Sequence, residues 1–362
     1  MDLNEMLADL ELLVTTESPS HDIAAITASA AVLAGVMERR LGSAPDLVDG
    51  PAGPHVHWVG GGAPRVLIVG HHDTVFPMGT LVARPFAIAD GKVTGPGVFD
   101  MKAGIVQAVH AVASLADASG IEILITSDEE VGSATSRALI EERALACGAV
   151  LVFEPSADGG AVKIARKGVG TFEVIVHGKA SHAGLEPEKG VNSLVAAAEL
   201  ITTIATFGDP ARGTTVTPTM ASAGTAENVV PARTRVLVDV RVVEPAEKTR
   251  IEALMAGLQT TVPGATVEVL GGLNRPPMHE SASATLFPVA VRAAERAGLP
   301  TLVGVAVGGG SDGNLTAAVG VPTLDGLGAV GGGAHADHEH VFVDTIVDRA
   351  RLTATLLSDL LA

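Results

Sequence analysis

The sequence predicts an α/β fold in which a mixed, mostly parallel sheet is flanked by helices, with a smaller α+β domain inserted into it. Apolar runs at residues 66–69, 121–126 and 149–153 are short enough to be buried strands, and helix-like stretches separate them. Such β-α-β-α-β alternation is typical of a parallel sheet covered by helices on both faces. From about residue 165, apolar and polar residues alternate instead, which indicates antiparallel strands with helices on one face.

The predicted helices are stretches in which apolar residues recur at a helical period and which end near glycine, proline or capping residues. In the larger domain they cover residues 3–16, 22–41, 101–116, 135–146, 282–297 and 345–361, with a further strand at 301–305. In the inserted domain, helices at 190–205 and 245–259 accompany strands at 168–180, 233–243 and 265–272. We expect the larger domain to comprise residues 1–164 and 276–362, and the inserted domain residues 165–275.

Two local patterns before the third predicted helix add detail to the larger domain. His55 and His57 alternate with apolar residues after a linker rich in glycine and proline, which predicts an edge strand with exposed imidazoles. Residues 86–93 are predicted to form a small hairpin, because the Asp90-Gly91 pair favours a tight turn.

The composition excludes several classes of function. The 362 residues contain 41 acidic and 24 basic side chains, a formal charge of −17 that disfavours nucleic acid and anionic membranes as partners. No apolar run approaches the roughly 20 residues that span a bilayer, and the amino terminus lacks a basic region followed by an apolar core. We therefore expect a cytoplasmic protein. The single cysteine, Cys147, is predicted to be a buried thiol.

Acidic and histidine residues stand where the predicted strands end. Open α/β sheets place their ligands outside the carboxyl ends of their strands. The residues in question are His71 and Asp73 after the first strand, Asp100 in a glycine-rich loop, Glu129 and Glu130 after the second strand, Glu154 after the third, and His335 after a late glycine-rich loop. Any one of these patterns alone is more often structural, but their coincidence at separate strand ends and loops predicts a metal site.

The donor types fit a pair of divalent cations. His71, Asp100, Glu130, Glu154 and His335 supply nitrogen and oxygen ligands, and one carboxylate of such a set can bridge two ions. Asp73 lies two residues past His71, on the same side of an extended chain, where it can accept the imidazole N–H. Glu129 and Glu130 are adjacent and point differently, so one can bind metal while the other acts as a general base.

Six motifs occur in an order that resembles one metallopeptidase family. They are GHHDTV, GPGVFDMKAG, SDEEVGS, FEPS, GKASHAG and GGAHADHE. The set resembles the family of glutamate carboxypeptidase of the folate-hydrolysing type, acetylornithine deacetylase, succinyl-diaminopimelate desuccinylase and aminoacylase-1. The resemblance spans nearly the whole chain, and it implies a zinc-exopeptidase-like catalytic domain with an inserted lid domain that usually dimerises.

By motif position, the resemblance implies a role for each candidate residue. His71 and Glu154 would hold one zinc, Glu130 and His335 the other, and Asp100 would bridge them. Glu129 matches the general base and Asp73 the carboxylate that orients a ligand histidine, while His182 in GKASHAG matches a histidine that stabilises the oxyanion from a partner subunit. Cobalt or manganese could replace zinc at so carboxylate-rich a site.

Two residues of the inserted domain bear on the substrate. Asn228 and Arg275 resemble the carboxylate-binding groups of carboxypeptidase-like relatives, and a guanidinium grips a carboxylate with two parallel hydrogen bonds. The expected reaction is zinc-dependent hydrolysis of an amide bond in a small N-acyl amino acid or short peptide, releasing an amino acid with a free α-carboxylate, by a homodimer formed through the lid.

Alternatives remain open at this point. An N-acyl-amino-acid deacylase differs from a carboxypeptidase mainly in its acyl group, and the motifs do not distinguish the two. A catalytically silent metal-binding or dimerisation protein would be expected to lack the base or a ligand, whereas Glu129 and the ligand set are intact. The loop GGGSDGN lacks the lysine and the strand-to-helix context of a phosphate-binding P-loop.

Overall fold

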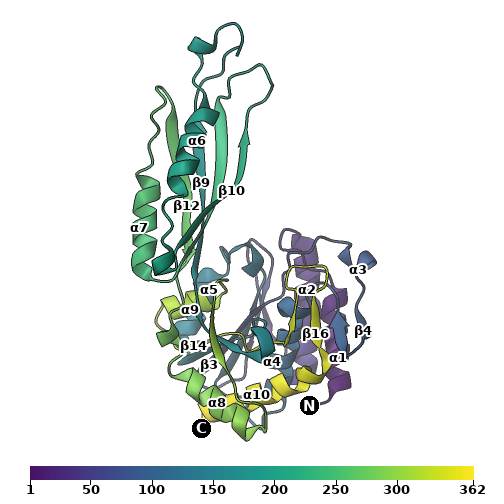
Figure 1. Cartoon of the computed structure of the whole chain (residues 1–362). Coiled ribbons are helices and arrows are strands. Elements are labelled where there is room, and N and C mark those ends of the chain that lie inside the picture. The colour runs from purple at the N-terminus through teal and green to yellow at the C-terminus, as the bar shows by residue number, and fades with distance from the viewer. The chain divides into compact units, whose positions relative to one another are not determined.

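The computed structural model describes residues 1–362, and the chain divides into two compact units. The first comprises Met1–Ala165, Met278–Val307 and Ser311–Ala362, and the second comprises Arg166–Pro277 with Gly308–Gly310. Figure 1 shows the chain with its elements labelled. No helix is both long enough and apolar enough to cross a membrane.

A six-stranded sheet with the order β1-β2-β6-β3-β7-β14 forms the centre of the first unit. Four of its strands are parallel: β3 (Val66–His71), β6 (Ile121–Thr126), β7 (Ala149–Val152) and β14 (Thr323–Leu324). The other two, β1 (Asp46–Val48) and β2 (His55–Val59), extend the sheet in antiparallel fashion. The predicted mixed, mostly parallel α/β fold is therefore confirmed.

Strand β3 is buried on both faces because its successive side chains enter two different hydrophobic cores. Val66 and Ile68 belong to the larger core, and Leu67 and Val69 belong to the smaller one. The larger core is supplied by α1 (Leu3–Thr15), α2 (Ile23–Leu41), α4 (Ala103–Ala113), α8 (Leu286–Arg296) and α10 (Val343–Leu361). The smaller core is supplied by α5 (Arg137–Ala146) and α9 (Gly313–Ala318). An uninterrupted apolar run such as that of β3 is what burial on both faces requires.

Smaller elements complete the first unit. A short helix, α3 (Thr80–Ala83), follows β3, and Cys147 is buried, as predicted. A four-stranded sheet contains β4 (Ala87–Ala89), β5 (Lys92–Thr94), β15 (Gly331–Gly332) and β16 (His340–Phe342). A two-stranded sheet pairs β8 (Val162–Arg166) with β13 (Gly304–Val307), so the strand expected at 301–305 begins three residues later.

The prediction for His55 and His57 was wrong. Strand β2 lies between β1 and β6 rather than at an edge of the sheet. His55 is buried and its Nδ1 accepts the backbone N–H of Ser127, while His57 Nε2 lies 3.0 Å from a carboxylate oxygen of Glu122. The sequence pattern was correct for a strand, but the pairing of β1 outside β2 could not be deduced from it.

The second unit is an antiparallel sheet with helices packed against it. Its strands, in the order β10-β11-β9-β12, are β9 (Gly168–His177), β10 (Thr215–Ala223), β11 (Arg233–Val242) and β12 (Thr266–Arg275). Helices α6 (Ser193–Ile204) and α7 (Pro245–Ala256) share one hydrophobic core with this sheet (Figure 1). Strand β10 was not predicted, because its residues are mostly exposed and it contains a proline at a register shift.

Candidate metal centre

His71 is the last residue of β3, and its ring is fixed by the chain that follows it. The side chain is 1% exposed, and Nδ1 lies 3.0 Å from the backbone oxygen of Asp73 and 3.4 Å from its carboxylate. Nδ1 therefore carries the proton, which leaves Nε2 as the atom that can bind a metal. Burial alone would lower the pKa of His71, but the neighbouring carboxylates of Asp100 and Asp73 outweigh it and hold the pKa well above its usual value.

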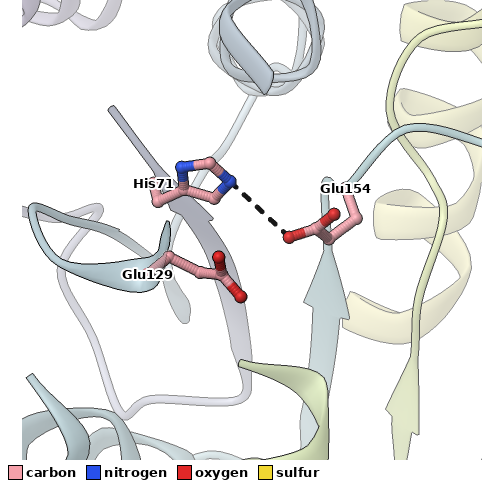
Figure 2. A group of neighbouring side chains, drawn as sticks. All are labelled: His71, Glu129 and Glu154. Atoms are coloured by element: carbon pink, nitrogen blue, oxygen red, sulfur yellow. Dashed lines mark ion pairs between the residues drawn. The ribbon is translucent and has the colours of Figure 1, made fainter. Parts of the chain in front are cut away.

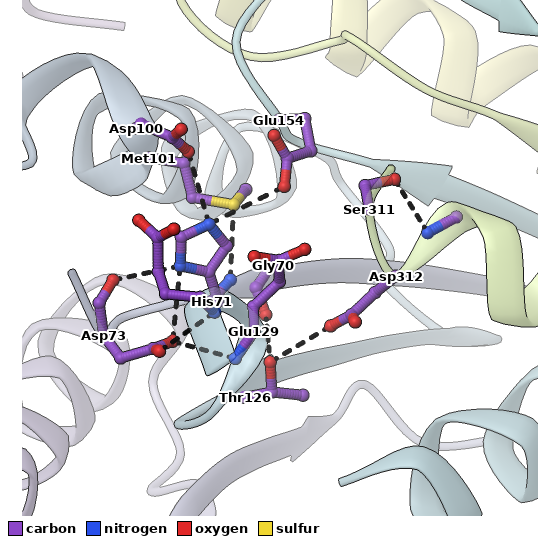
Figure 3. A network of polar contacts seen from close by, with 12 residues as sticks. Gly70, His71, Asp73, Asp100, Met101, Thr126, Glu129, Glu154, Ser311 and Asp312 are labelled. Atoms are coloured by element: carbon purple, nitrogen blue, oxygen red, sulfur yellow. Dashed lines mark hydrogen bonds and ion pairs between the residues drawn. The ribbon is translucent and has the colours of Figure 1, made fainter. Parts of the chain in front are cut away.

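Asp73 connects His71 to the acidic turn after β6. Its buried carboxylate accepts a hydrogen bond from Ser20 Oγ at 2.7 Å and from the backbone N–H groups of Glu129 and Glu130, both at 3.2 Å. Figure 3 shows Asp73 beside the His71 ring, with its contact to Glu129. Burial raises the pKa of Asp73, but the hydrogen bonds from His71 and Ser20 more than offset this effect and lower it. One side chain thus positions residues from two strand ends.

Asp100 lies between two histidines. Its Oδ1 is 3.3 Å from His71 Nε2, and its Oδ2 is 3.3 Å from His335 Nε2. It belongs to a π-helical turn (Val98–Lys102) with non-helical dihedral angles at Asp100, and the Asp100–Met101 peptide bond is cis. A carboxylate whose two oxygens face different imidazoles has the geometry of a bridging ligand.

The Asp100 turn is held by a buried carboxylate on the segment before β16. Glu339 accepts hydrogen bonds from the backbone N–H groups of Gly97, Phe99 and Asp100 at 2.8, 2.9 and 2.9 Å. Burial raises the pKa of Glu339 to about 7 despite these three bonds. Glu339 therefore fixes the backbone that leads into the bridging position.

The remaining ligand candidates complete two pairs. Glu154, just after β7, lies 3.6 Å from His71 Nε2, and Glu130 lies 3.1 Å from His335 Nε2. His335 has a left-handed backbone, with φ of 62°, and a half-exposed ring, so it closes the cluster from the solvent side. Hydrogen bonds to Asp100 and Glu130 raise its pKa to about 10.

The cluster has the properties of a site for two divalent cations. Ligand atoms of His71, Asp100 and Glu130 lie within 4.8 Å of one another, and so do those of His71, Glu129 and Glu154 (Figure 2). Asp100 Oδ1 and Glu130 Oε1 are buried and have no hydrogen-bond partner, which is costly unless a cation binds them. Carboxylate and imidazole donors without thiolates suit zinc, and also cobalt or manganese.

Proximity by itself makes Glu129 as plausible a ligand as Glu130. The two follow each other in a short 3₁₀ turn (Glu129–Val131), and both backbone N–H groups bind Asp73. Glu130 lies against His335, and the Glu129 carboxylate approaches the His71 and Glu154 side of the cluster, as Figure 2 shows. The turn thus presents two carboxylates to different parts of one cluster.

Sequence reasoning missed Asp312, which contacts both ends of this turn. Its Oδ2 accepts a hydrogen bond from Thr126 Oγ1 at 3.2 Å, at the end of β6 (Figure 3). Its Oδ1 accepts one from Ser133 Oγ, just after the turn. Asp312 is 2% exposed. The acid within GGGSDGN was a signal for such a role, since a carboxylate among glycines needs donors from elsewhere when it is buried.

The other predicted site residues belong to the second unit. His182 is exposed, and its Nδ1 accepts the backbone N–H groups of Gly184 and Leu185, both at 3.1 Å, so Nε2 is the protonated ring nitrogen. Asn228 is exposed, and its backbone oxygen accepts the N–H of Ala183. Arg275, at the end of β12, is 5% exposed.

Comparison with known proteins gives concordant results. Residues 67–359 match peptidase family M20/M25/M40. The chain is 34% identical over 314 residues to carboxypeptidase G2 of Pseudomonas sp. (strain RS-16), covering 83% of this chain and 75% of that protein. It is 35% identical over 149 residues to a succinyl-diaminopimelate desuccinylase of Sulfurovum sp. (strain NBC37-1), covering 38% and 40%. The structure of the M20 family metallo-carboxypeptidase Sso-CP2 from Sulfolobus solfataricus superimposes with a TM-score of 0.78 at 18% identity, covering 99% of both chains.

Proposed function

The chain belongs to peptidase family M20/M25/M40 and is a metallohydrolase, and on that premise we propose that it releases an amino acid with a free α-carboxylate by hydrolysing an amide bond. The observation that carries this proposal is the position of Asp100 between His71 and His335, with the Glu129 carboxylate in the same cluster. A bridging carboxylate and a neighbouring acid that is not needed as a ligand are what hydrolysis with two cations requires.

We propose that the resident ions are two Zn²⁺, with Co²⁺ or Mn²⁺ as possible substitutes. His71 and Glu154 would hold one ion, Glu130 and His335 the other, and Asp100 would contact both. When bound, the ions would polarise the substrate carbonyl and lower the pKa of the attacking water. The two buried oxygens without hydrogen-bond partners, on Asp100 and Glu130, support this assignment.

Glu129 is the proposed general base. Its backbone is fixed by Asp73, so the carboxylate can accept a proton from the attacking water and later donate it to the departing amine. His182 would donate from Nε2 to the oxyanion, since its Nδ1 is already an acceptor of two backbone N–H groups. The second unit, residues 166–277, would act as the lid and as the surface for homodimerisation.

The substrate preference is proposed from one relative and from two residues. Carboxypeptidase G2, at 34% identity, is named for removal of a carboxyl-terminal residue. Arg275 and Asn228 would bind the α-carboxylate of the residue that is released. The second candidate function, deacylation of an N-acyl amino acid, is favoured by the 35% identity to a desuccinylase over 149 residues.

The test measures release of free amino acid from a panel of dipeptides, N-acyl glutamates and N-acetyl amino acids. Zinc-loaded protein is compared with Glu129→Gln and with a control, Glu142→Gln, whose side chain is 71% exposed on α5. General acid–base catalysis contributes about 10² to 10⁴ in rate, so Glu129→Gln should lose about that factor while binding the same amount of zinc. Equal activity of the variant and the wild type would refute the role of Glu129.

Two further measurements test which acyl group the enzyme accepts and whether it recognises the α-carboxylate of the substrate. A best substrate whose acyl group is an amino acid favours the carboxypeptidase, and one with a simple acyl group favours the deacylase. Amidation of the α-carboxylate of that substrate should raise KM sharply, and Arg275→Lys should do so less, because lysine keeps the charge but loses the paired hydrogen bonds. An amidated substrate that is cleaved equally well would rule out carboxylate recognition.

A further inference from the structure

The first unit contains a cavity of about 460 Å³ to which no role is assigned above. It lies between α8, α10, the loop 158–161 and the segment 299–305. None of the metal-ligand candidates, nor Glu129 or Asp73, lines it. The volume is in the range of small-molecule sites, which are mostly apolar with a few placed polar groups.

The polar group in the wall of this cavity is a buried arginine that has no carboxylate partner. Arg349 is 6% exposed, and it donates from Nε to Gly328 O at 2.9 Å, from Nη1 to Gly160 O at 2.9 Å and from Nη2 to Gly326 O at 2.6 Å. All three acceptors are backbone carbonyls. A guanidinium has five N–H donors, so two remain beyond these three bonds.

The electrostatic position of Arg349 is unusual for so buried a cation. Buried charges are normally paired with an opposite charge. Burial lowers the pKa of Arg349 to about 10, and nothing offsets this effect. A buried guanidinium with donors to spare is a good partner for a carboxylate, because the bond is charge-assisted on both sides and formed away from water.

The rest of the cavity wall provides groups of two other kinds. Leu299, Leu302 and Leu352 line it with branched aliphatic side chains. Two carboxylates also line it: Asp158 is exposed, and Asp348 is 47% exposed and makes an ion pair with Arg351 at 3.3 Å. An exposed ion pair of this kind contributes little, so Asp348 can accept a further cation at small cost.

We propose that this cavity is a binding site for a free aliphatic amino acid in its zwitterionic form. Its α-carboxylate binds Arg349, its ammonium group is attracted by both Asp158 and Asp348, and its side chain packs on the leucines. A simple anion would be repelled by the two carboxylates, and a simple amine would be repelled by the arginine. Only a ligand that carries both charges and an apolar body satisfies all three kinds of group.

The test titrates zinc-loaded protein with L-leucine and follows the methyl resonances of Leu299, Leu302 and Leu352. Two analogues, 4-methylpentanoate and isopentylamine, each lack one charge of the zwitterion. Leucine should shift these resonances saturably, and each analogue should bind at least about tenfold more weakly, the factor expected for one lost charge-assisted contact. Because the readout is at the cavity, it does not depend on turnover or on binding at the metal cluster.

Two variants separate the cavity from other parts of the protein. Asp348→Asn removes a carboxylate from a half-exposed position and should weaken leucine binding several-fold, while Asp344→Asn, on an exposed residue of α10 that does not line the cavity, should not. Ala294→Leu should fill part of the cavity and abolish binding. The proposal is overturned if leucine leaves the methyl resonances unshifted up to about 20 mM, which corresponds to a binding free energy weaker than about −2.3 kcal/mol. It is equally overturned if both analogues bind as tightly as leucine, or if Asp348→Asn and Ala294→Leu bind leucine like the wild type.

Discussion

Replacing Asp312 by asparagine tests whether this residue holds the acidic turn in place for metal binding. Its carboxylate accepts hydrogen bonds from Thr126 and Ser133, which lie on either side of the Glu129–Glu130 turn. An asparagine side chain is uncharged and has one acceptor oxygen, so one of the two hydroxyl groups loses its acceptor and the other keeps only a neutral one. A hydrogen bond to a charged group contributes about 1.5–3 kcal/mol, which corresponds to about 10- to 150-fold in an equilibrium constant.

We expect this loss to appear as weaker metal binding. Residues that orient metal ligands typically change metal affinity by about 10- to 100-fold, the same range as the hydrogen-bond estimate. The measurement is the zinc affinity of Asp312→Asn by competition with a chelator, with urea unfolding of the metal-free protein alongside. Asp46→Asn, on the exposed edge strand β1, is the matched control.

A double-mutant cycle makes the interpretation specific. Ser133→Ala removes one of the two donors. The double variant should therefore lose less zinc-binding free energy than the sum of the losses in Ser133→Ala and Asp312→Asn. Wild-type zinc affinity in Asp312→Asn would refute the proposed role. So would a loss of unfolding free energy with no change in metal binding, since Asp312 would then contribute only to the stability of the fold.

Four further predictions follow from the structure. Gly328→Ala should lower the free energy of unfolding by at least about 1–3 kcal/mol in urea titration, because the added Cβ would lie 2.2 Å from Phe153 O. Burial would raise the pKa of Asp9, but hydrogen bonds, led by that from Arg40, lower it. Asp9 therefore stabilises the fold above the pKa of an unfolded aspartate, about 4, and this contribution is lost as the pH falls towards the folded pKa. The unfolding free energy of Asp9→Asn should fall less steeply over this pH range. Burial raises the pKa of the Cys147 thiol to about 12, so native protein should react with maleimide only on unfolding, and fast labelling would contradict the structure. Chelation should lower the Tm and zinc should restore it, since ions that bind only the folded state stabilise it.

The strands of the central sheet could be predicted where burial on both faces requires an apolar residue at every position. The run Val66–Val69 is apolar throughout because its alternate side chains enter two different cores, and no polar residue is tolerated on either face. The order of the strands in the sheet was harder to predict from the sequence. Strand β2 has the residues of an edge strand, but it is covered by β1, whose three residues carry almost no pattern. Strand β10 contains a proline and mostly exposed residues, so neither alternation nor propensity identified it.

In the candidate site, the sequence identifies the ligand candidates at the strand ends, whereas only the tertiary structure identifies the residues that hold them. Ligand-type residues are visible in the sequence because histidines and acids directly after several buried strands of one sheet meet at the same edge of that sheet. The residues that hold them are not visible in this way. Glu339 and Asp312 bind backbone or hydroxyl groups 239 and 179 positions away in the chain, at Asp100 and Ser133. Both contacts satisfy buried carboxylates with donors from a distant segment, and the need for such donors appears only once the segments are packed together. For this reason the geometry that sets metal affinity depends on residues whose role does not follow from the position of a strand end, and variants of Asp312 and Glu339 examine it more directly than variants of the ligands do.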